Sequence, residues 1–378
     1  MKCIVFLALA VLALARHDII FHPGSQIIPG RYIVSLKHDD VSTAAVEEHH
    51  KWIQSVLEDH PESTITHVYN TDKLKGYAGT FNDQVLEKLR HNDAIEYIEH
   101  DQVINNRERL AVRYLEEEIV QEKDSFFPRQ RPSVQENAPW GISRVSSRPI
   151  PEAYGNYSYP VSAGNGIDVY VIDTGIYVEH SQFEGRAKWG TSFISWEGDF
   201  DGNGHGTHCA GTIGGKDFGV AKNVNLIAVK VLSSGGSGSM SGVVGGIEWV
   251  VKEHLKNPKA KSVASMSLGG GRSPSLDRAV DVAVKKGVHF AVAAGNENQD
   301  AFDIASAWIG DTDAVNVISG TSMATPHVAG VIALYLAIQD LNPTQLKKEL
   351  VSDSTKDVIK GLPKRTINAL LNTNELFE

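Results

Sequence analysis

The sequence predicts an α/β protein with a mostly parallel sheet, preceded by a small α+β unit with the element order of a ferredoxin-like fold. From about residue 139 onward, apolar strand patterns alternate with helical patterns, and such alternation indicates right-handed crossovers within a parallel sheet. The segment Asp168–Ile172 is mostly apolar, as in a strand buried on both faces. Over about residues 31–104 the expected order is β-α-β-β-α-β, which is typical of ferredoxin-like units.

The expected elements follow the apolar spacing in each unit. In the small unit, strands are expected at 32–36, 64–69, 76–81 and 95–103, and helices at 42–58 and 82–91. In the large unit, strands are expected at 168–172, 225–232, 262–268 and 289–294, and helices at 240–255 and 275–286. Because sites in parallel sheets lie at the carboxyl ends of the strands, residues that follow these strands are the first candidates for chemistry.

The composition limits the classes of partner. The chain has 378 residues, of which 42% are hydrophobic, and this is enough for one large domain with a sizeable core and a smaller domain. The formal net charge of −10 argues against nucleic acid as a main partner.

The N-terminus has the pattern of a secretory signal peptide. Lys2 supplies a positive charge, Ile4–Ala15 is apolar, and residues 13–15 read Ala-Leu-Ala, the small-residue pattern of a cleavage site. We expect residues 1–15 to be removed in the secretory pathway, with a vacuole or lysosome-like compartment or the exterior as destination. The apolar run is too short to span a bilayer, and no later segment is long enough, so we expect no membrane span.

One cysteine, Cys209, would remain after this cleavage, because the other is Cys3. A chain with one cysteine has no internal disulfide, so its stability must come from core packing or bound ions.

Residues 105–136 differ in composition from both units. They carry three consecutive glutamates at 116–118, a basic stretch with a proline at 129–132, and no apolar period. We expect an exposed, cleavable linker there.

The stretch Gly320–Gly330 reads Gly-Thr-Ser-Met-Ala-Thr-Pro-His-Val-Ala-Gly and is continued by an apolar run. The run indicates a buried helix, and Pro326 is expected within its first turn, where the missing N–H had no partner. Ser322 would then lie at the helix N-terminus, at the positive end of the helix dipole. Two interpretations are open at this point: Ser322 is a capping residue, as serine often is, or a nucleophile.

Three further side chains occupy the ends of expected strands or the starts of helices. Asp173 follows the strand 168–172, His205 lies among glycines before a helix of small residues, and Asn296 follows the strand 289–294. A histidine oriented by an aspartate can act as a general base, and an amide can donate a hydrogen bond to a developing oxyanion. The order Asp, His, Asn, Ser therefore predicts a nucleophilic site around Ser322.

Each of these residues has an alternative interpretation. Asp173 begins an Asp-Thr-Gly sequence, which is also an aspartic-protease signature, but that mechanism needs two carboxylates and the sequence occurs once. His208 and Cys209 could suggest a metal site, and His205 and His208 a metal hydrolase, but the pattern lacks the glutamate of a zinc protease and the second cluster of a zinc ribbon. Asn296 could be an ordinary turn residue.

Three motifs, Asp173–Gly175, His205–Gly211 and Gly320–His327, resemble the signatures of subtilisin-like serine proteases, peptidase family S8. The cysteine within the second motif resembles the proteinase K subgroup. Residues 137–142, 219–222 and 267–271 resemble the fungal vacuolar protease B (cerevisin) group. The resemblance covers about residue 137 to the end, and residues 31–104 look like an inhibitor I9-type propeptide. It implies a three-layer subtilisin-like fold over 137–378 and an inhibitory propeptide over 16–104.

The resemblance also implies roles for the site residues. Ser322 would be the nucleophile and His205 the general base. Asp173 would orient the base, and Asn296 would be the oxyanion donor. The chain would then be a serine endopeptidase made as a self-processing zymogen. The residues implied to bind substrate as an added strand are Gly236, Ser237, Gly238, Ser267, Leu268 and Gly269, and those implied to wall the pocket before the cut are Ala293, Ala294 and Gly295.

The expected partners are protein and peptide substrates and the chain's own propeptide, with the enzyme acting as a monomer. No cofactor is expected, no metal ligand is identified, and structural calcium cannot be assigned to residues. Asn156 begins the one glycosylation sequon.

One departure from the family is expected to matter. Only 25 residues separate Asn296 from Ser322, where the family has a considerably longer segment that completes the sheet and the pocket. We expect a deletion near residues 302–304. The alternative function is therefore an inactive or decoy paralogue, or a mis-spliced product, with an incomplete substrate pocket.

Overall fold

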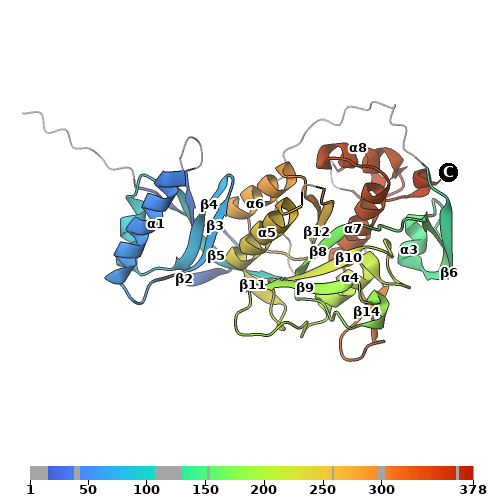
Figure 1. The fold of residues 1–378 in the computed structure, drawn as a ribbon, viewed down its shortest axis with the longest axis horizontal. Coiled ribbons are helices and arrows are strands. Elements are labelled where there is room, and N and C mark those ends of the chain that lie inside the picture. Colours follow the sequence, from blue (N-terminus) through green and yellow to red (C-terminus); the bar gives the residue numbers. More distant parts are fainter. Residues whose placement is uncertain are drawn as a thin grey trace, which may run out of the picture.

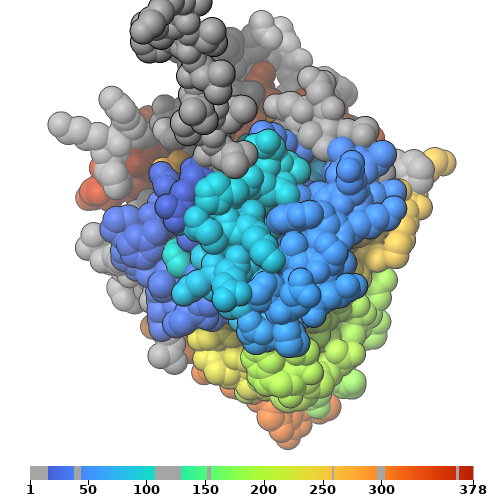
Figure 2. Space-filling model, turned by 90° about the vertical axis from the view of Figure 1, so that its left-hand side faces the viewer, coloured from blue at the N-terminus to red at the C-terminus, as the bar shows by residue number. Residues whose placement is uncertain are grey.

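The computed structural model describes residues 16–37, 43–106, 129–150, 154–257, 259–295, 303–362 and 366–377. A small N-terminal unit, drawn in blue, lies against the helices α5 (Met240–Leu255) and α6 (Pro274–Lys285) of a larger unit (Figure 1). Viewed from its own side, the small unit covers the face of the larger one (Figure 2). The expected signal peptide, residues 1–15, lies outside the described residues.

The small unit begins with a two-residue strand that was not predicted and then has the predicted β-α-β-β-α-β order. Its elements are β1 (Ile19–Ile20), β2 (Ile27–Leu36), α1 (Thr43–Glu58), β3 (Thr64–Thr71), β4 (Leu74–Thr80), α2 (Asp83–Arg90) and β5 (Ile95–Asn105). The strand order β1-β5-β2-β4-β3 contains the ferredoxin-like arrangement. Side chains alternate along β2: Val34 packs with α1 and α2 inside the unit, whereas Ile33 packs with buried residues of α5. The sheet therefore has its own core on one face and a contact with the large unit on the other.

The large unit has three layers, which confirms the predicted α/β fold. Its central parallel sheet runs in the order β13-β12-β8-β10-β9. The strands are β8 (Asp168–Asp173), β9 (Ala187–Ser192), β10 (Asn225–Lys230), β12 (Ser262–Met266) and β13 (His289–Val292). Successive side chains of β8 point alternately toward the two outer layers. Val169 and Val171 pack with α4 (His205–Gly214) and α7 (Thr321–Ile338), and Tyr170 and Ile172 pack with α5.

Several short elements were not predicted. They are α3 (Trp140–Val145), β6 (Pro132–Pro139), β7 (Tyr154–Pro160), β9, β11 (Ser237–Ser239), β14 (Ile304–Ala307), β15 (Val315–Ile318), α8 (Pro343–Asp353), β16 (Thr355–Lys356), β17 (Ala369–Leu370) and the 3₁₀ turns Ser181–Phe183 and Asn374–Leu376. Helix α8 begins with a capping box between Asn342 and Gln345.

Both ends of the expected linker over 105–136 belong to strands. Asn105 is the last residue of β5, and residues 132–136 belong to β6, which pairs antiparallel with β7. The side chains of these residues are mostly exposed, so the strand is defined by backbone pairing and leaves no apolar period in the sequence. Residues 107–128 lie outside the described residues.

In the described part of the chain, one helix, α7, has the length and hydropathy of a membrane span, and 72% of that stretch is buried inside the protein. Its side chains belong to the apolar core between the sheet and α4, so core packing accounts for its composition.

Candidate active site

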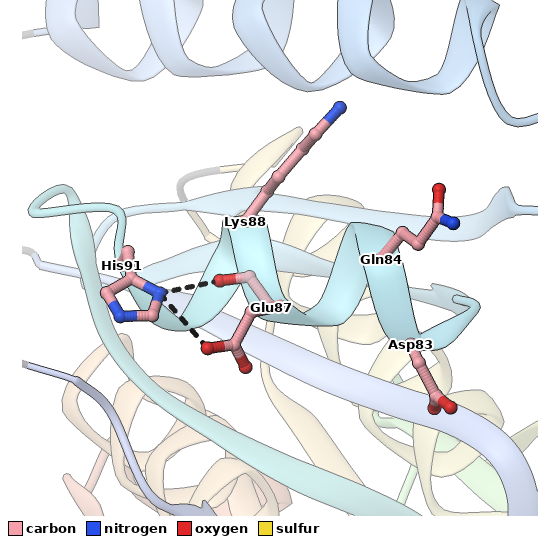
Figure 3. A pocket seen from close by; sticks show the side chains of 5 residues that line it. All are labelled: Asp83, Gln84, Glu87, Lys88 and His91. Atoms are coloured by element: carbon pink, nitrogen blue, oxygen red, sulfur yellow. Dashed lines mark hydrogen bonds and ion pairs between the residues drawn. The ribbon is translucent and has the colours of Figure 1, made fainter.

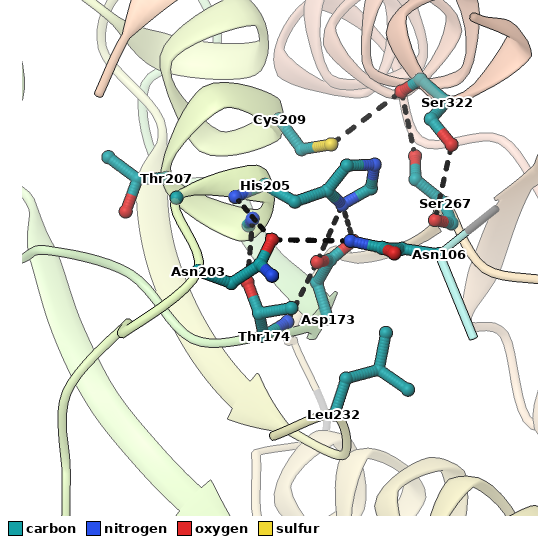
Figure 4. Close-up of polar contacts among 12 residues, drawn as sticks. Asn106, Asp173, Thr174, Asn203, His205, Thr207, Cys209, Leu232, Ser267 and Ser322 are labelled. Carbon is teal, nitrogen blue, oxygen red and sulfur yellow. Dashed lines mark hydrogen bonds and ion pairs between the residues drawn. The ribbon is translucent and has the colours of Figure 1, made fainter. Parts of the chain in front are cut away.

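Asp173 and His205 form a direct pair. Asp173 ends β8 and His205 begins α4, so both lie at the carboxyl end of the parallel sheet. His205 Nδ1 lies 2.8 Å from Asp173 Oδ1 and 3.0 Å from Oδ2, and the Thr174 N–H donates to Oδ1 at 2.7 Å. Asp173 is fully buried and His205 is 7% exposed. The carboxylate therefore fixes the orientation of the imidazole ring (Figure 4).

The electrostatic surroundings of His205 suit a general base. Burial alone lowers the pKa of His205, but the charge of Asp173, the hydrogen bond to Asp173 and the charge of Asp201 outweigh burial and raise this pKa. His205 Nε2 is buried and has no hydrogen-bond partner among the described residues. A neutral His205 with its proton on Nδ1 leaves Nε2 free to accept a proton, as a general base requires.

Ser322 lies in the first turn of α7, after the N-cap residue Gly320, so the helix begins where the sequence predicted. The side chain is nearly buried, and its Oγ donates to the carbonyl of Ser267 at 3.3 Å. Figure 4 shows Ser322 and Ser267 together on one side of the His205 ring. The hydroxyl must leave the Ser267 carbonyl before it can donate to His205.

Pro326 is not in the first turn, which corrects the sequence prediction. It is the sixth residue of α7, and because proline has no N–H, the carbonyl of Ser322 lacks its helical donor. That carbonyl accepts instead from Ser267 Oγ at 2.9 Å and from the Cys209 thiol at 3.6 Å. These contacts explain how a buried helix tolerates the proline, and they connect the backbone of Ser322 to α4 and to the segment after β12.

Sequence reasoning missed Asp201. This buried carboxylate accepts from Thr174 Oγ1 and the Gly204 N–H, each at 2.9 Å, and from the Thr207 N–H at 3.0 Å and Oγ1 at 2.6 Å. It satisfies unpaired donors at the start of α4 and so holds the turn that carries His205. The sequence feature that could have identified Asp201 is the Asp-Gly-Asn-Gly stretch directly before a helix, which is typical of a turn with a side-chain acceptor.

The end of β5 lies between two edges of the large unit. On one side, β11 (Ser237–Ser239) pairs antiparallel with the last three residues of β5, and the Asn106 N–H donates to the Gly236 carbonyl at 3.1 Å. On the other side, Asn105 and Gly269 exchange two backbone hydrogen bonds of 2.9 and 2.7 Å. The structure thus brings the two segments expected to bind substrate to either side of one extended strand.

The expected pocket wall follows β13. Ala293 is buried, Ala294 is exposed and Gly295 has a φ of 101°. Asn296 lies outside the described residues, so its role as oxyanion donor stays a prediction.

Two other expected residues can be placed. Leu268 is buried beside Ser267 and Gly269, and Asn156 is exposed on β7.

Two buried carboxylates of β5 bind helix N-termini of the large unit. Glu99 accepts from Ser273 Oγ and from the Ser275 N–H, each at 3.1 Å, where α6 begins. Asp101 accepts from the Ser241 N–H at 3.0 Å and Oγ at 2.7 Å, where α5 begins. Negative charge is favourable at both places. Burial raises the pKa of Glu99 to about 7, against the opposing effect of its hydrogen bonds.

The metal interpretation finds little support. Among the described residues, one group of three side chains could hold an ion: Asp173, His205 and Cys209. Burial raises the pKa of the Cys209 thiol well above its usual value, which disfavours the metal-binding thiolate. His208 is not part of the group, and its Nε2 lies 3.0 Å from the Ile304 carbonyl oxygen.

A hollow on the surface of α2 is lined by Asp83, Gln84, Glu87, Lys88 and His91 (Figure 3). Its contacts are those of neighbouring turns of one exposed helix, such as His91 Nδ1 to the Glu87 carbonyl at 2.9 Å. It lies in the small unit, and we assign it no catalytic role.

A histidine paired with a carboxylate at the end of a parallel sheet and a serine at the start of a buried helix are components expected of a serine hydrolase, and a strand paired with two edges is the arrangement expected for a bound peptide. Comparison with known families agrees. Residues 164–316 and 310–369 match the Subtilase family, peptidase family S8, and residues 31–105 match peptidase inhibitor I9. The chain belongs to the subtilase family of serine proteases and carries an I9 propeptide.

Relatives support this assignment along most of the chain. Subtilisin-like proteinase Spm1 of Pyricularia oryzae is 37% identical, over 98% of this chain and 84% of that protein. Alkaline protease 2 of Aspergillus fumigatus is 38% identical, over 92% of this chain and 81% of that protein. The crystal structure of a cold-adapted subtilisin-like serine proteinase is 41% identical with a TM-score of 0.57, and the match covers 62% of this chain and 98% of that chain. The likeness to the cerevisin group stays a prediction.

The comparisons also bear on the short interval before Ser322. The family match is in two parts, which overlap at residues 310–316 within that interval. The alignment with Spm1 has 463 positions and this chain has 378 residues, so at least 85 positions lie opposite gaps in this chain. These observations show that this chain is shorter than its relatives, and the deletion near residues 302–304 stays a prediction.

Proposed function

We propose that the chain is a self-processing serine endopeptidase zymogen in which Ser322 is the nucleophile, His205 the general base and Asp173 its orienting carboxylate. The observation that carries the proposal is the pair of hydrogen bonds between His205 Nδ1 and Asp173, next to the start of the helix that bears Ser322. Asn296 completes the proposed site as the oxyanion donor.

The proposed mechanism follows from the free atoms of the site. The Ser322 hydroxyl turns from the Ser267 carbonyl to His205 Nε2, which takes its proton as Oγ attacks the peptide carbonyl. The imidazolium is stabilised by Asp173 and then gives the proton to the leaving amine, which breaks the peptide bond and leaves an acyl-enzyme. Water, deprotonated by His205, hydrolyses the ester and restores Ser322.

The contacts of β5 suggest how a substrate is held. A peptide would pair with Gly236, Ser237 and Gly238 on one side and with Gly269 on the other, as β5 does here. Backbone pairing gives affinity with little side-chain selectivity, so we propose broad specificity for protein substrates. The wall formed by Ala293, Ala294 and Gly295 would bound the side chain before the cut.

The propeptide acts as an intramolecular inhibitor in this proposal because β5 occupies the place of a substrate strand. We expect self-cleavage within a few residues after Asn106, which would place the boundary between propeptide and enzyme inside 105–136. The mature enzyme would be a monomer of the secretory pathway, glycosylated at Asn156, without a required cofactor and with no calcium ligands assigned.

A comparison of the wild-type chain with Ser322→Ala tests the proposal. We expect the purified wild-type chain to cut itself near Asn106 and to react with a fluorophosphonate probe, and the variant to do neither. The control is Ser352→Ala, at an exposed position of α8. A wild-type chain that stays whole and unlabelled would favour the decoy alternative. A variant in which the interval before Ser322 is lengthened with the corresponding segment of a relative then shows whether the short interval is the cause of inactivity.

A further inference from the structure

Lys230 is a fully buried cation at the strand position next to Asp173. It ends β10 and lies opposite Asp173 in the register of β8 and β10. Its ammonium donates to the carbonyls of Thr174 at 2.7 Å and Leu232 at 2.9 Å, and pairs with Glu197 Oε2 at 3.1 Å. These contacts match the three N–H donors of the ammonium, so the geometry around Lys230 is fully specified.

Glu197 extends this contact to the next segment. Both of its carboxylate oxygens accept from the Ser234 N–H at 3.0 Å, and Oε2 also accepts from Ser234 Oγ at 2.9 Å. The Phe200 ring lies 5.9 Å from the Lys230 ammonium and helps to cover the pair. A buried ion pair adds little net stability, because desolvation offsets the attraction. We therefore explain the Lys230–Glu197 pair by the backbone geometry that it imposes and not by a gain in stability.

The pair joins the catalytic residues to one substrate edge. Thr174 follows Asp173 and donates its N–H to that carboxylate. Leu232 and Ser234 lead directly into β11, the strand that pairs with β5. Lys230 therefore contacts the backbone on both sides, and Glu197 fixes the loop between Leu232 and β11.

We propose that Lys230 and Glu197 are positioning residues that hold the edge Gly236–Ser239 in place relative to the Asp173–His205 pair. The inference rests on the proposed function and adds the class of substrate on which the pair acts. Peptides long enough to form a strand beside β11 depend on it. Small esters that reach only Ser322 and His205 do not.

Kinetics with two substrates test the inference. We compare wild type, Glu197→Gln and the double variant Lys230→Met/Glu197→Gln on a peptide anilide with four residues before the cut and on a single-residue ester. In the double variant, KM for the peptide rises about tenfold, the loss expected for one or two misplaced backbone hydrogen bonds, while KM for the ester stays within about twofold. Lys285→Met, which breaks an exposed ion pair with Asp281, is the control and changes neither value.

A second measurement does not depend on catalysis. In full-length chains carrying Ser322→Ala, hydrogen–deuterium exchange at Leu232–Ser239 becomes faster in the double variant and not in the control. If the wild-type enzyme hydrolyses neither substrate, the proposed function fails and the exchange result decides the inference alone. Equal losses on both substrates, or unchanged KM together with unchanged exchange, would overturn the positioning role.

Discussion

Pro326 lies four residues after Ser322 in α7 and leaves the Ser322 carbonyl free to accept from Ser267 and Cys209. The backbone of the proposed nucleophile is therefore held by side chains of two other segments instead of by its own helix. Ser267 has a double part in this arrangement, because its hydroxyl holds the Ser322 backbone and its carbonyl accepts from the Ser322 hydroxyl.

The substitution Ser267→Ala removes the hydroxyl and keeps the backbone edge. We expect the free energy of unfolding to fall by about 1–2 kcal/mol, because a buried carbonyl loses its main donor. We also expect kcat to fall more than KM rises, since Ser322 is displaced while the substrate edge remains. Denaturant unfolding and steady-state kinetics measure both, with Ser352→Ala, at an exposed position of α8, as the control. A stable variant with unchanged kcat contradicts the role given to this hydroxyl.

The substitution Asp173→Asn removes the charge that raises the pKa of His205. In other Ser–His–Asp enzymes, loss of this carboxylate lowers kcat on the order of 10⁴-fold, and we expect a similar loss here. His205 must be neutral to act as a base, so wild-type activity falls as pH drops through its raised pKa. In the variant the acid limb of the remaining activity should move to lower pH. An acid limb at the same pH in both proteins would show that another group controls it.

Glu99 should weaken the propeptide contact as pH rises. Its pKa is about 7 in the buried contact and 4.5 as an ordinary carboxyl, so bound Glu99 holds a proton that the free propeptide releases. The contribution of this proton to propeptide affinity is complete below pH 4.5 and is lost as pH rises through 7. Between these two values the affinity falls by at most about tenfold per pH unit. Size-exclusion chromatography of the self-cleaved protein at pH 5 and 8 measures the retained propeptide. Glu99→Gln should flatten the difference, and an unchanged difference would exclude Glu99 as its source.

His49 should act in the opposite direction through the stability of the small unit. Its Nε2 lies 3.0 Å from Tyr77 Oη, and burial, followed by the charge of His50, lowers its pKa to about 4. The folded unit therefore disfavours the charged ring. Stability is complete above pH 6.5 and declines as pH falls toward 4, by about 3 kcal/mol at most.

Pulse proteolysis in urea at pH 7.5 and 5, in the Ser322→Ala background, checks this prediction. His49→Phe should remove most of the decline, whereas His91→Phe, a change at the surface of α2, should keep it. A decline that survives in His49→Phe would assign the pH effect to other groups.

The sequence predicted those parts of the fold that depend on apolar periodicity. Strands such as β8 and helices such as α5 bury side chains at regular spacing, and this spacing is visible in the residues themselves. The pair β6–β7 was missed because its pairing depends on backbone hydrogen bonds, which leave no apolar pattern in the sequence. The position of Pro326 was misjudged because the donors that compensate for it, Ser267 and Cys209, come from elsewhere in the fold.

In the site, Asp173, His205 and Ser322 could be predicted because each lies at the junction of a strand or helix with a turn. The contacts of Lys230 could not, because a buried cation has no periodic pattern and its partners are carbonyls and a carboxylate of other segments. Asp201 did have a local signal, the Asp-Gly-Asn-Gly stretch before α4. The sequence also pointed to the short interval before Ser322 through its length alone.

Strand β5 belongs to the sheet of the small unit and also pairs with β11. Cutting the chain beyond Asn106 would leave that pairing intact, so cleavage and the opening of the cleft are separate events. Before the cut, the strand is tethered and its effective concentration at the cleft does not depend on the amount of protein. After the cut, occupancy depends on dilution and on destruction of the released propeptide. Activity should therefore appear with a lag that shortens as the protein is diluted or as the first free enzyme molecules digest the propeptide of their neighbours.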